Sequence, residues 1–391
     1  MARAPISGNT GSLRIAVIGG GVIGLACALE LRRRGAQVAV YERGVELGGG
    51  ATMRAAGMLG LASEAAAESE APALFGLARR SANLWPAFAS DVERQGGGAV
   101  GFAQDGAIVV ARTQAEVGWL EGLSAACQAR DLPSRWLDPA DLRRQEPAAT
   151  GPARAGLLLP SDSQVDAAML LQRLGAAAGR AGIGVRLGRT VERIGAGAEF
   201  TLPDGERFDR VLLATGAAAE RVRFEGRPGM AIDPGVGPIV PVKGQMLALA
   251  PVAGAPRHVV RMRHVYVAPK ARWILVGATE ERGRADATVD PAAIQRLRDT
   301  AAEVIGALKD AAEIASWAGV RPGTPDDAPM IGETATPGVF VAMGHYRNGI
   351  LLAPATAEIV ADQMLDGKVS PLAAAFSPRR FDKPVTAPHS R

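Results

Sequence analysis

Three glycines near the N-terminus have the spacing of a phosphate-binding turn. Gly19, Gly21 and Gly24 follow the apolar run Ile15-Ala16-Val17-Ile18 and precede an Ala- and Leu-rich segment. Such a turn between a strand and a helix brings backbone N–H groups and the positive end of the helix dipole to a pyrophosphate. Gly19 permits the turn, Gly21 lets the backbone approach the anion, and Gly24 allows close packing of helix on strand. A bare glycine triplet can also be only a tight turn, so the flanking elements decide between the two.

A carboxylate and a second glycine-rich stretch narrow the choice of ligand. Glu42 ends the next apolar segment, where a carboxylate accepts hydrogen bonds from ribose hydroxyls and repels a 2′-phosphate, which disfavours NADP. The stretch from Gly48 to Leu59 is rich in small residues and suits a long, flat ligand close to the main chain. The motif alone does not separate NAD from FAD, and a flexible glycine loop is the alternative interpretation of the stretch.

The elements around these residues indicate a doubly wound α/β sheet. The apolar run at residues 15–18, a helix from Val22 to Leu31 ended by Gly35, and a strand over residues 38–41 form a βαβ unit. Asp166 is the expected N-cap of a helix over residues 167–180. Further strands of the same sheet are predicted at residues 183–187, 191–194 and 211–214.

The rest of the chain predicts a second domain. Residues 74–160 contain two helical stretches and strand-like pieces such as residues 107–110. Alternating segments at residues 245–249, 263–267 and 273–276 indicate an antiparallel sheet, and a long amphipathic helix is expected over residues 291–308. We therefore predict a flexible arm at residues 1–13, a discontinuous dinucleotide-binding domain at residues 14–90, 161–225 and 316–391, and a substrate-binding domain at residues 91–160 and 226–315.

Composition and charge exclude several classes of protein. Of the 391 residues, 48% are hydrophobic and 21% are charged, which allows a large core and excludes a disordered chain. The net charge of +4 is a small surplus and does not indicate a nucleic-acid partner. The two cysteines, Cys27 and Cys127, exclude a disulfide framework and favour a reducing compartment. A polar N-terminus and interrupted apolar stretches predict a soluble, cytoplasmic protein without a targeting or membrane-spanning segment.

Four segments together resemble the FAD-dependent D-amino acid oxidase superfamily, and within it most of all the glycine oxidases of the thiamine pathway. They are Arg14 to Leu59, Ala214-Thr215-Gly216, Trp317 to Asp326 and Gly344 to Pro354. The last two are specific, whereas the first is shared with many flavoproteins. The resemblance implies an FAD-binding, Rossmann-type domain of the glutathione-reductase-like kind, joined to a substrate domain with an antiparallel sheet.

The resemblance also implies the residues of a cofactor site. Relatives that attach flavin covalently use a Cys late in the chain or a His near the N-terminal loop, and neither is present here, so the FAD is expected to be noncovalent. Contacts with FAD, beside the glycine turn, are expected at Val22, Ile23, Glu42, Arg43, Gly50, Ala51, Thr52, Ala56, Gly57, Met58, Val191, Ala214, Thr215, Gly216, His345, Tyr346, Arg347, Asn348, Gly349, Ile350 and Leu351.

A substrate site is implied at Arg321, with Tyr266 and Arg347 lining the same pocket. A guanidinium is a planar fork that binds a carboxylate through two hydrogen bonds, and Pro322 holds the backbone of Arg321 extended. A structural ion pair is the alternative for Arg321, and an ordinary sheet tyrosine is the alternative for Tyr266.

The resemblance also places a helix beside the flavin. An apolar helix over residues 349–364 would point its N-terminus at the flavin and stabilise negative charge there. His345 has no partner at metal-ligand spacing among the four histidines, so we expect no metal.

Two places depart from the family pattern. Met53-Arg54 stands where small residues are usual, which puts a cation near the flavin loop. In the pair Glu280-Glu281, the first residue stands where the family tends to have an apolar residue close to the substrate. A carboxylate there is expected to repel the carboxylate of a simple amino acid and to favour a second amine or a cationic side chain.

These observations predict an FAD-dependent amine oxidase that acts on glycine, sarcosine or a small D-amino acid. Hydride passes from Cα to flavin N5, the imine hydrolyses to an oxo acid and ammonia, and oxygen reoxidises the flavin and yields peroxide. A dehydrogenase of D-amino or N-methyl amino acids that uses another electron acceptor is the nearer alternative. A tRNA-modifying flavoprotein and a flavin-binding subunit without turnover are the others, and a homo-oligomer is left open.

Overall fold

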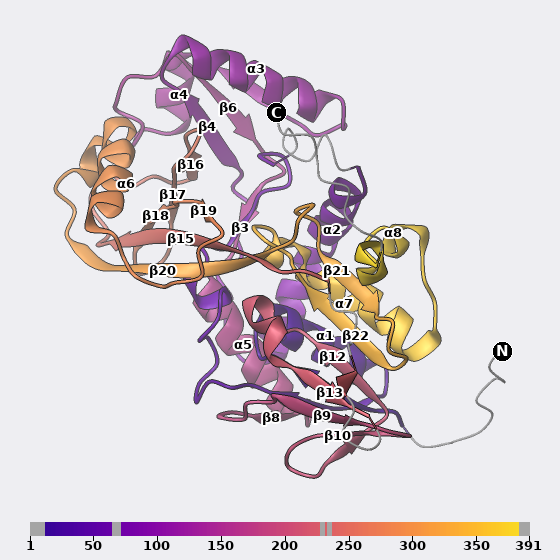
Figure 1. The fold of residues 1–391 in the computed structure, drawn as a ribbon. Helices are drawn as coiled ribbons and strands as arrows, with labels where there is room; N and C mark the ends of the chain where they lie inside the picture. The colour runs from indigo at the N-terminus through magenta and orange to yellow at the C-terminus, as the bar shows by residue number, and fades with distance from the viewer. Residues whose placement is uncertain (1–11, 65–71, 227–230, 233–236, 383–391) are drawn as a thin grey trace.

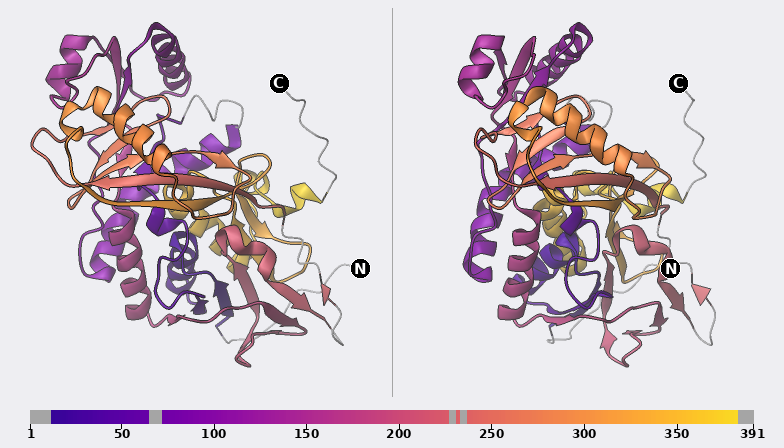
Figure 2. Two further views of the ribbon diagram at one scale, coloured as in Figure 1. Left: turned by 60° about the vertical axis from the view of Figure 1, so that its left-hand side comes forward. Right: turned by 90° about the vertical axis from the view of Figure 1, so that its left-hand side faces the viewer.

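The computed structural model describes residues 12–64, 72–226, 231–232 and 237–382 (Figure 1). Apart from residues 12 and 13, the predicted N-terminal arm lies outside these ranges. A six-stranded sheet with its helices and a nine-stranded sheet are the two largest assemblies. In Figure 2 the two longest strands of the nine-stranded sheet run between helix α6 on one side and helices α1, α5 and α7 on the other.

The six-stranded sheet is the doubly wound sheet that the sequence predicts. Its strands are parallel except for an antiparallel strand at one edge. Helices cover one face of this sheet and a second sheet covers the other, so both faces of its strands are buried. This burial agrees with their short, continuously apolar sequences. In spatial order they are β21 (Met330–Glu333), β22 (Val339–Met343), β12 (Arg210–Leu213), β1 (Arg14–Ile18), β2 (Gln37–Tyr41) and β8 (Gly184–Arg186).

Four helices share the core on one face of this sheet. The α1·α7, α2·α7 and α2·α5 pairs pack directly on each other. Asp166 caps α5 as predicted, since its Oδ1 accepts from the N–H groups of Ala168 and Met169 at 3.0 Å each. The helices are α1 (Val22–Arg33), α2 (Pro72–Gly96), α5 (Ala167–Arg180) and α7 (Gly349–Asp366).

A separate five-stranded sheet covers the other face of the six-stranded sheet. One predicted strand of the six-stranded sheet belongs to it instead. The strand expected at residues 191–194 in the doubly wound sheet is β9 (Arg193–Ala196), which pairs with β10 and β13 instead. Four apolar residues do not specify their neighbours. The neighbouring strands bring Phe200 and Phe224 onto Ile18 and Leu213, which favours a second layer. The remaining strands are β10 (Phe200–Thr201), β11 (Arg207–Phe208), β13 (Arg223–Glu225) and β14 (Ala231–Ile232).

The nine-stranded sheet is mostly antiparallel, as predicted, with one parallel pair between β4 and β16. The strand expected from residue 263 begins at Tyr266, because residues 262–265 form the turn after β16, closed by Met262 N–H to Val265 O at 2.7 Å. Its strands are β19 (Glu281–Arg282), β15 (Val240–Leu249), β18 (Ile274–Gly277), β17 (Tyr266–Pro269), β16 (Val259–Arg261), β4 (Ala107–Ala111), β6 (Ala155–Leu159), β5 (Arg135–Leu137) and, beside β15, β20 (Glu313–Gly323).

The remaining elements lie on or between the sheets. Helix α6 (Pro291–Val304) is shorter than expected, because Gly306 begins a separate turn, η4 (Gly306–Leu308). No helix in the described ranges is both long and apolar enough to cross a bilayer. The others are α3 (Gln114–Gln128), α4 (Pro139–Gln145), α8 (Pro371–Ala374), η1 (Thr52–Arg54), η3 (Gly216–Arg221), η5 (Pro378–Phe381) and the pair β3 (Met58–Leu59) and β7 (Ser163–Gln164).

The predicted domain boundaries cut across some of these elements. The boundary at residue 91 falls inside α2, and the boundary at residue 316 falls inside β20. Strand β20 pairs with β15 along its length, so Arg321 belongs to the nine-stranded sheet. The division into two domains by these residue numbers stays a prediction.

Replacing Gly24 by alanine tests the close packing of α1 on the glycine turn. A Cβ at Gly24 would lie 1.9 Å from the carbonyl oxygen of Gly19. We expect Gly24→Ala to lose about 1–3 kcal/mol of unfolding free energy or more, and to bind FAD poorly. Gly122→Ala in α3 is the control, because nothing lies within 4 Å of the added methyl group. It should gain up to about 1 kcal/mol. Urea denaturation measures both, and an equal effect of the two variants would contradict the packing argument.

Candidate active site

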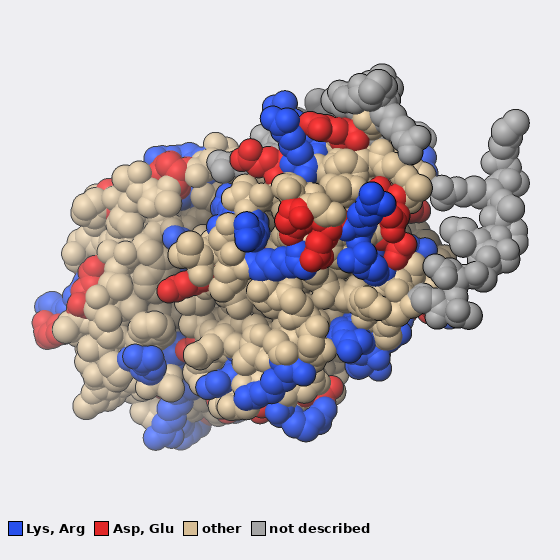
Figure 3. Space-filling view, turned by 90° about the horizontal axis from the view of Figure 1, so that it is seen from below, with Lys and Arg blue, Asp and Glu red and all other residues tan. Residues whose placement is uncertain are grey.

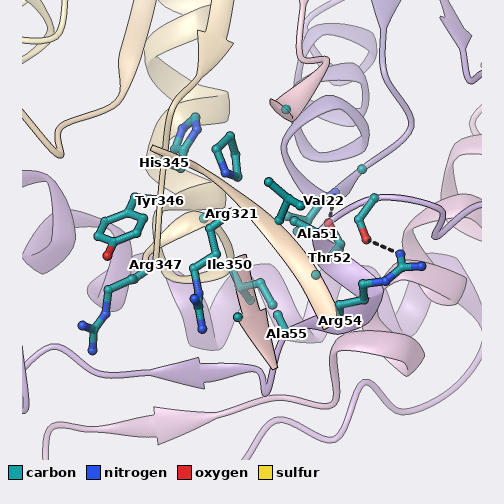
Figure 4. A pocket seen from close by; sticks show the side chains of 18 of the residues that line it. Val22, Ala51, Thr52, Arg54, Ala55, Arg321, His345, Tyr346, Arg347 and Ile350 are labelled. Atoms are coloured by element: carbon teal, nitrogen blue, oxygen red, sulfur yellow. Dashed lines mark hydrogen bonds between the residues drawn. The ribbon is translucent and has the colours of Figure 1, made fainter. Parts of the chain in front are cut away.

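One cavity of about 630 Å³ joins the glycine turn to the nine-stranded sheet (Figure 4). The N-terminus of α1, the loop before β3, strands β15, β17 and β20, and the start of α7 all contribute to its walls. This volume is within the usual range for small-molecule sites.

The glycine turn has the local geometry that the spacing predicts. Gly19 has φ +117°, and a Cβ there would lie 2.3 Å from the carbonyl oxygen of Ala214, which directly follows the neighbouring parallel strand β12. Gly21, Val22 and Ile23 line the cavity at the N-terminus of α1. The turn and the helix end therefore stand open to an anion at the carboxyl edge of the sheet.

Glu42 fixes the same turn from the end of β2. Its Oε2 accepts from the N–H of Gly20 at 2.8 Å, and its Oε1 accepts from the N–H of Gly44 at 2.8 Å. The carboxylate lines the cavity, and each oxygen keeps a further lone pair for a hydroxyl group. This arrangement suits a ribose held beside the pyrophosphate turn.

Arg54 ties the small-residue loop together. Its Nη1 donates to Gly49 O at 2.8 Å and to Gly50 O at 3.3 Å (Figure 4). Its own carbonyl oxygen accepts from Trp317 Nε1 of β20 at 3.2 Å. Arg54, which stands where the family has small residues, therefore links the loop to the strand that carries Arg321.

Arg321 projects into the cavity from β20 (Figure 4). Its Nη1 donates to Thr279 O at 3.2 Å, and a Cβ on the facing Gly244 would lie 2.3 Å from that nitrogen. Glycine on β15 therefore leaves room for the guanidinium. Among the described residues, no carboxylate forms an ion pair with Arg321, which excludes the structural ion pair as its role within these ranges.

Tyr266 lies near this cation. Its hydroxyl donates to Met246 Sδ at 3.5 Å, a long and weak contact that leaves the group available to a ligand. Burial raises the pKa of the Tyr266 phenol above its ordinary value, although Arg321 and other nearby arginines act in the opposite direction. The phenol is therefore protonated at neutral pH and can donate a hydrogen bond.

A chain of four alternating charges forms another part of the wall. Arg261 Nη2 lies 2.7 Å from Glu64 Oε1, and the same oxygen lies 3.2 Å from Arg347 Nη2. Arg347 Nη1 lies 3.2 Å from Glu280 Oε2. Burial opposes ionisation of Glu64, but Arg261 and Arg347 outweigh it and hold the pKa of Glu64 below its ordinary value. All four side chains belong to residues that line the cavity.

His345 and Tyr346, just before α7, form hydrogen bonds that hold the start of this helix in place. His345 Nε2 lies 3.0 Å from Thr356 Oγ1, and burial lowers the pKa of His345 to about 3, so the ring is neutral at pH 7. Tyr346, at φ +49°, donates its N–H to Pro322 O at 2.9 Å. This bond joins the approach to α7 to the strand that carries Arg321.

The structure brings nearly all of the predicted site residues to this cavity. Gly24 and Leu351 are the exceptions: Gly24 packs inside the turn, and the Leu351 carbonyl accepts from Ser81 and Trp85. Those that line it are Gly19, Gly21, Val22, Ile23, Glu42, Arg43, Gly50, Ala51, Thr52, Ala56, Gly57, Met58, Val191, Ala214, Thr215, Gly216, Tyr266, Arg321, His345, Tyr346, Arg347, Asn348, Gly349 and Ile350.

Sequence reasoning missed several lining residues. Glu64, Arg261, Gly244 and Met246 also line the cavity. No local motif marks these residues. They come together only because β15, β16 and β17 pair with strands that are distant in the sequence. Cys27 and Cys127 are buried and do not line it. The described part of the chain contains no group of three or more potential metal ligands.

Known proteins match the chain over most of its length. The family model for DAO, the FAD dependent oxidoreductases, matches residues 14–363. Glycine oxidase of Geobacillus kaustophilus is 35% identical over 356 residues, which cover 89% of this chain and 92% of the relative. The bifunctional protein ThiO/ThiG of a Nostoc species is 33% identical over 94% of this chain, which spans 55% of that protein. A crystal structure of glycine oxidase from Geobacillus kaustophilus has a TM-score of 0.84 at 34% identity and covers 94% of this chain and 99% of that one. These similarities confirm the family resemblance and the fold class.

The neutral state of His345 predicts a pH dependence of stability. Its folded pKa lies below the ordinary value of 6.5, so its contribution is complete above pH 6.5 and declines as the pH falls toward about 3. His345→Gln removes this titration and keeps a polar group for Thr356. Between about pH 6 and pH 4, the wild-type unfolding free energy should fall relative to the variant by about 1.4 kcal/mol per pH unit. Urea denaturation across this range measures the difference, and parallel pH profiles would overturn the assignment.

Proposed function

The chain belongs to the DAO family of FAD-dependent oxidoreductases, and on that premise we propose that it oxidises glycine, sarcosine or a small D-amino acid to the oxo acid and hydrogen peroxide, with release of ammonia, or of methylamine from sarcosine. The relatives named glycine oxidase support a small amino acid as substrate. The choice among these three substrates is part of the proposal.

The observation that carries the proposal is the unpaired guanidinium of Arg321. It is half-buried in the cavity, and among the described residues only the carbonyl oxygen of Thr279 accepts a hydrogen bond from it. A partly desolvated cation favours an anionic partner, and an α-carboxylate matches the planar fork. The protonated hydroxyl of Tyr266 would donate to the same carboxylate.

FAD, held by the glycine turn, Glu42 and the start of α7, would supply the redox chemistry, which is the removal of a hydride from the substrate and the transfer of its electrons to oxygen. The chain contributes by positioning, since Arg321 and Tyr266 would hold the carboxylate and thereby fix Cα. A substrate bound as the neutral amine needs no dedicated base. The imine that results takes up water and releases ammonia, or methylamine where the substrate is sarcosine.

The residues present fit FAD. The open N-terminus of α1 suits the pyrophosphate, Glu42 suits a ribose, and residues at the start of α7 line the same cavity. A Cβ at Gly49 or Gly50 would meet nothing within 4 Å, so the loop leaves space for a ligand near the main chain. We expect noncovalent attachment, since neither cysteine lines the cavity.

A dehydrogenase with another electron acceptor is the alternative that shares this site. Peroxide formed per substrate oxidised in air separates the two, with a ratio near one for the oxidase. A tRNA substrate has less support, because acidic side chains lie among many of the Lys and Arg side chains on the face shown in Figure 3. Arg282 pairs with Asp327 and Arg380 with Asp326, so these cations are already offset.

Loss of Arg321 should weaken carboxylate binding. We expect Arg321→Ala to raise the Kd of glycolate, an unreactive hydroxy acid, and the KM of the best amine by roughly 10- to 150-fold, since a charge-assisted pair contributes about 1.5–3 kcal/mol. Glycolate binding is followed by the change in flavin absorbance, and oxidation by anaerobic bleaching with glycine, sarcosine, D-alanine and D-proline. The control is Arg272→Ala, which removes an exposed cation from the bend between β17 and β18, outside the cavity. Turnover of glycine at an unchanged KM would remove Arg321 from the mechanism.

A further inference from the structure

Glu280 lines the cavity and forms an ion pair with Arg347. It follows Thr279, whose carbonyl oxygen accepts from Arg321, and its own carboxylate lies 3.2 Å from Arg347 Nη1. The sequence predicts that a carboxylate here repels the carboxylate of a simple amino acid. The structure instead pairs it with the second arginine of the site.

Among the charged side chains close to Tyr266, the pairing leaves one positive charge unmatched. Arg261 and Glu64 offset each other, and Arg347 and Glu280 do the same. Arg321 remains without a carboxylate partner among the described residues. A single α-carboxylate therefore matches the charge around Tyr266, whereas a second carboxylate on the ligand would have to compete with Glu280 for Arg347.

Glu280, and not Glu64, is the residue that can discriminate between ligands. The Glu64 side chain is 14% exposed and is fixed by Arg261 at 2.7 Å, so it belongs to the rigid wall. The Glu280 side chain is 49% exposed and belongs to a residue that lines the cavity. An exposed ion pair is weak and opens readily, so Glu280 can also turn to a cationic group of a ligand.

We propose that Glu280 is a specificity-determining residue, which keeps Arg347 from binding a second anion and restricts the enzyme to amino acids whose remaining substituent is neutral or cationic. The proposal rests on the proposed function, in which Arg321 binds the α-carboxylate. It names the excluded class: amino acids that carry a second carboxylate on the side chain or on the nitrogen.

The test compares two unreactive ligands on the FAD-loaded enzyme. Glycolate has one carboxylate and diglycolate has two, and both are titrated by the change in flavin absorbance. For the wild type we expect glycolate to bind at least about tenfold tighter than diglycolate. Glu280→Gln keeps the shape and removes the charge. It should strengthen diglycolate binding by about tenfold and change glycolate binding by less than about threefold.

A neighbouring carboxylate provides the matched control. Glu281 Oε1 accepts from Gln245 Nε2 and Thr279 Oγ1, and Glu281 does not line the cavity. Glu281→Gln should leave the ratio of the two affinities unchanged. Anaerobic bleaching by D-2,3-diaminopropionate, D-alanine and D-aspartate gives a second measurement: Glu280→Gln should favour D-aspartate and disfavour the diamine, with D-alanine little changed.

Two results would overturn the proposal. One is wild-type enzyme that binds diglycolate as tightly as glycolate, and the other is a Glu280→Gln variant that alters both affinities by the same factor. Either result leaves the proposed function intact if glycine, sarcosine or D-alanine still bleaches the flavin. If neither ligand perturbs the flavin and no amine bleaches it, the proposed function fails, and this inference fails with it.

Discussion

The unmatched positive charge of Arg321 is the constraint on which the organisation of the cavity depends. A half-buried cation is unfavourable unless water or an anion solvates it, and here only a single backbone carbonyl among the described residues does so. The other arginines next to it are already offset by Glu64 and Glu280. Near Tyr266, Arg321 is therefore the cation that an anionic ligand would neutralise.

Strand pairing supplies the rigidity that this site needs. Strand β20 follows β15 over ten residue pairs, in which Val242 faces Arg321 and Met246 faces Trp317. Two hydrogen bonds then join this strand pair to the other side of the cavity, from Tyr346 to Pro322 and from Trp317 to Arg54. A side chain mounted on a long paired strand moves less than one on a loop, so the orientation of the guanidinium is fixed before any ligand arrives.

The parts of this site that the sequence predicts are those encoded locally. The glycine turn, α1 and the cap at Asp166 each depend on contacts within about one supersecondary unit, and all are present as predicted. Glu42 follows β2 directly, as the sequence predicts, and its role toward a ribose stays a prediction. Arg321 was placed by a specific motif and a resemblance. By contrast, the partners of Arg347 come from segments more than 60 residues away in sequence, and no pattern encodes their meeting. The strand β9 was assigned to the wrong sheet for the same reason, because four apolar residues do not identify the strand beside them.

The order of strands in the six-stranded sheet has a consequence for how the enzyme matures. Strand β12 lies between β1, from the start of the chain, and β22, which is translated more than a hundred residues later. Helix α7, which packs on α1, is synthesised later still. A ribosome-bound chain that already contains the glycine turn therefore lacks the helix and strand that enclose it. Loading of the cofactor is thus expected to be post-translational, and folding through such distant contacts is slow compared with that of a helical bundle.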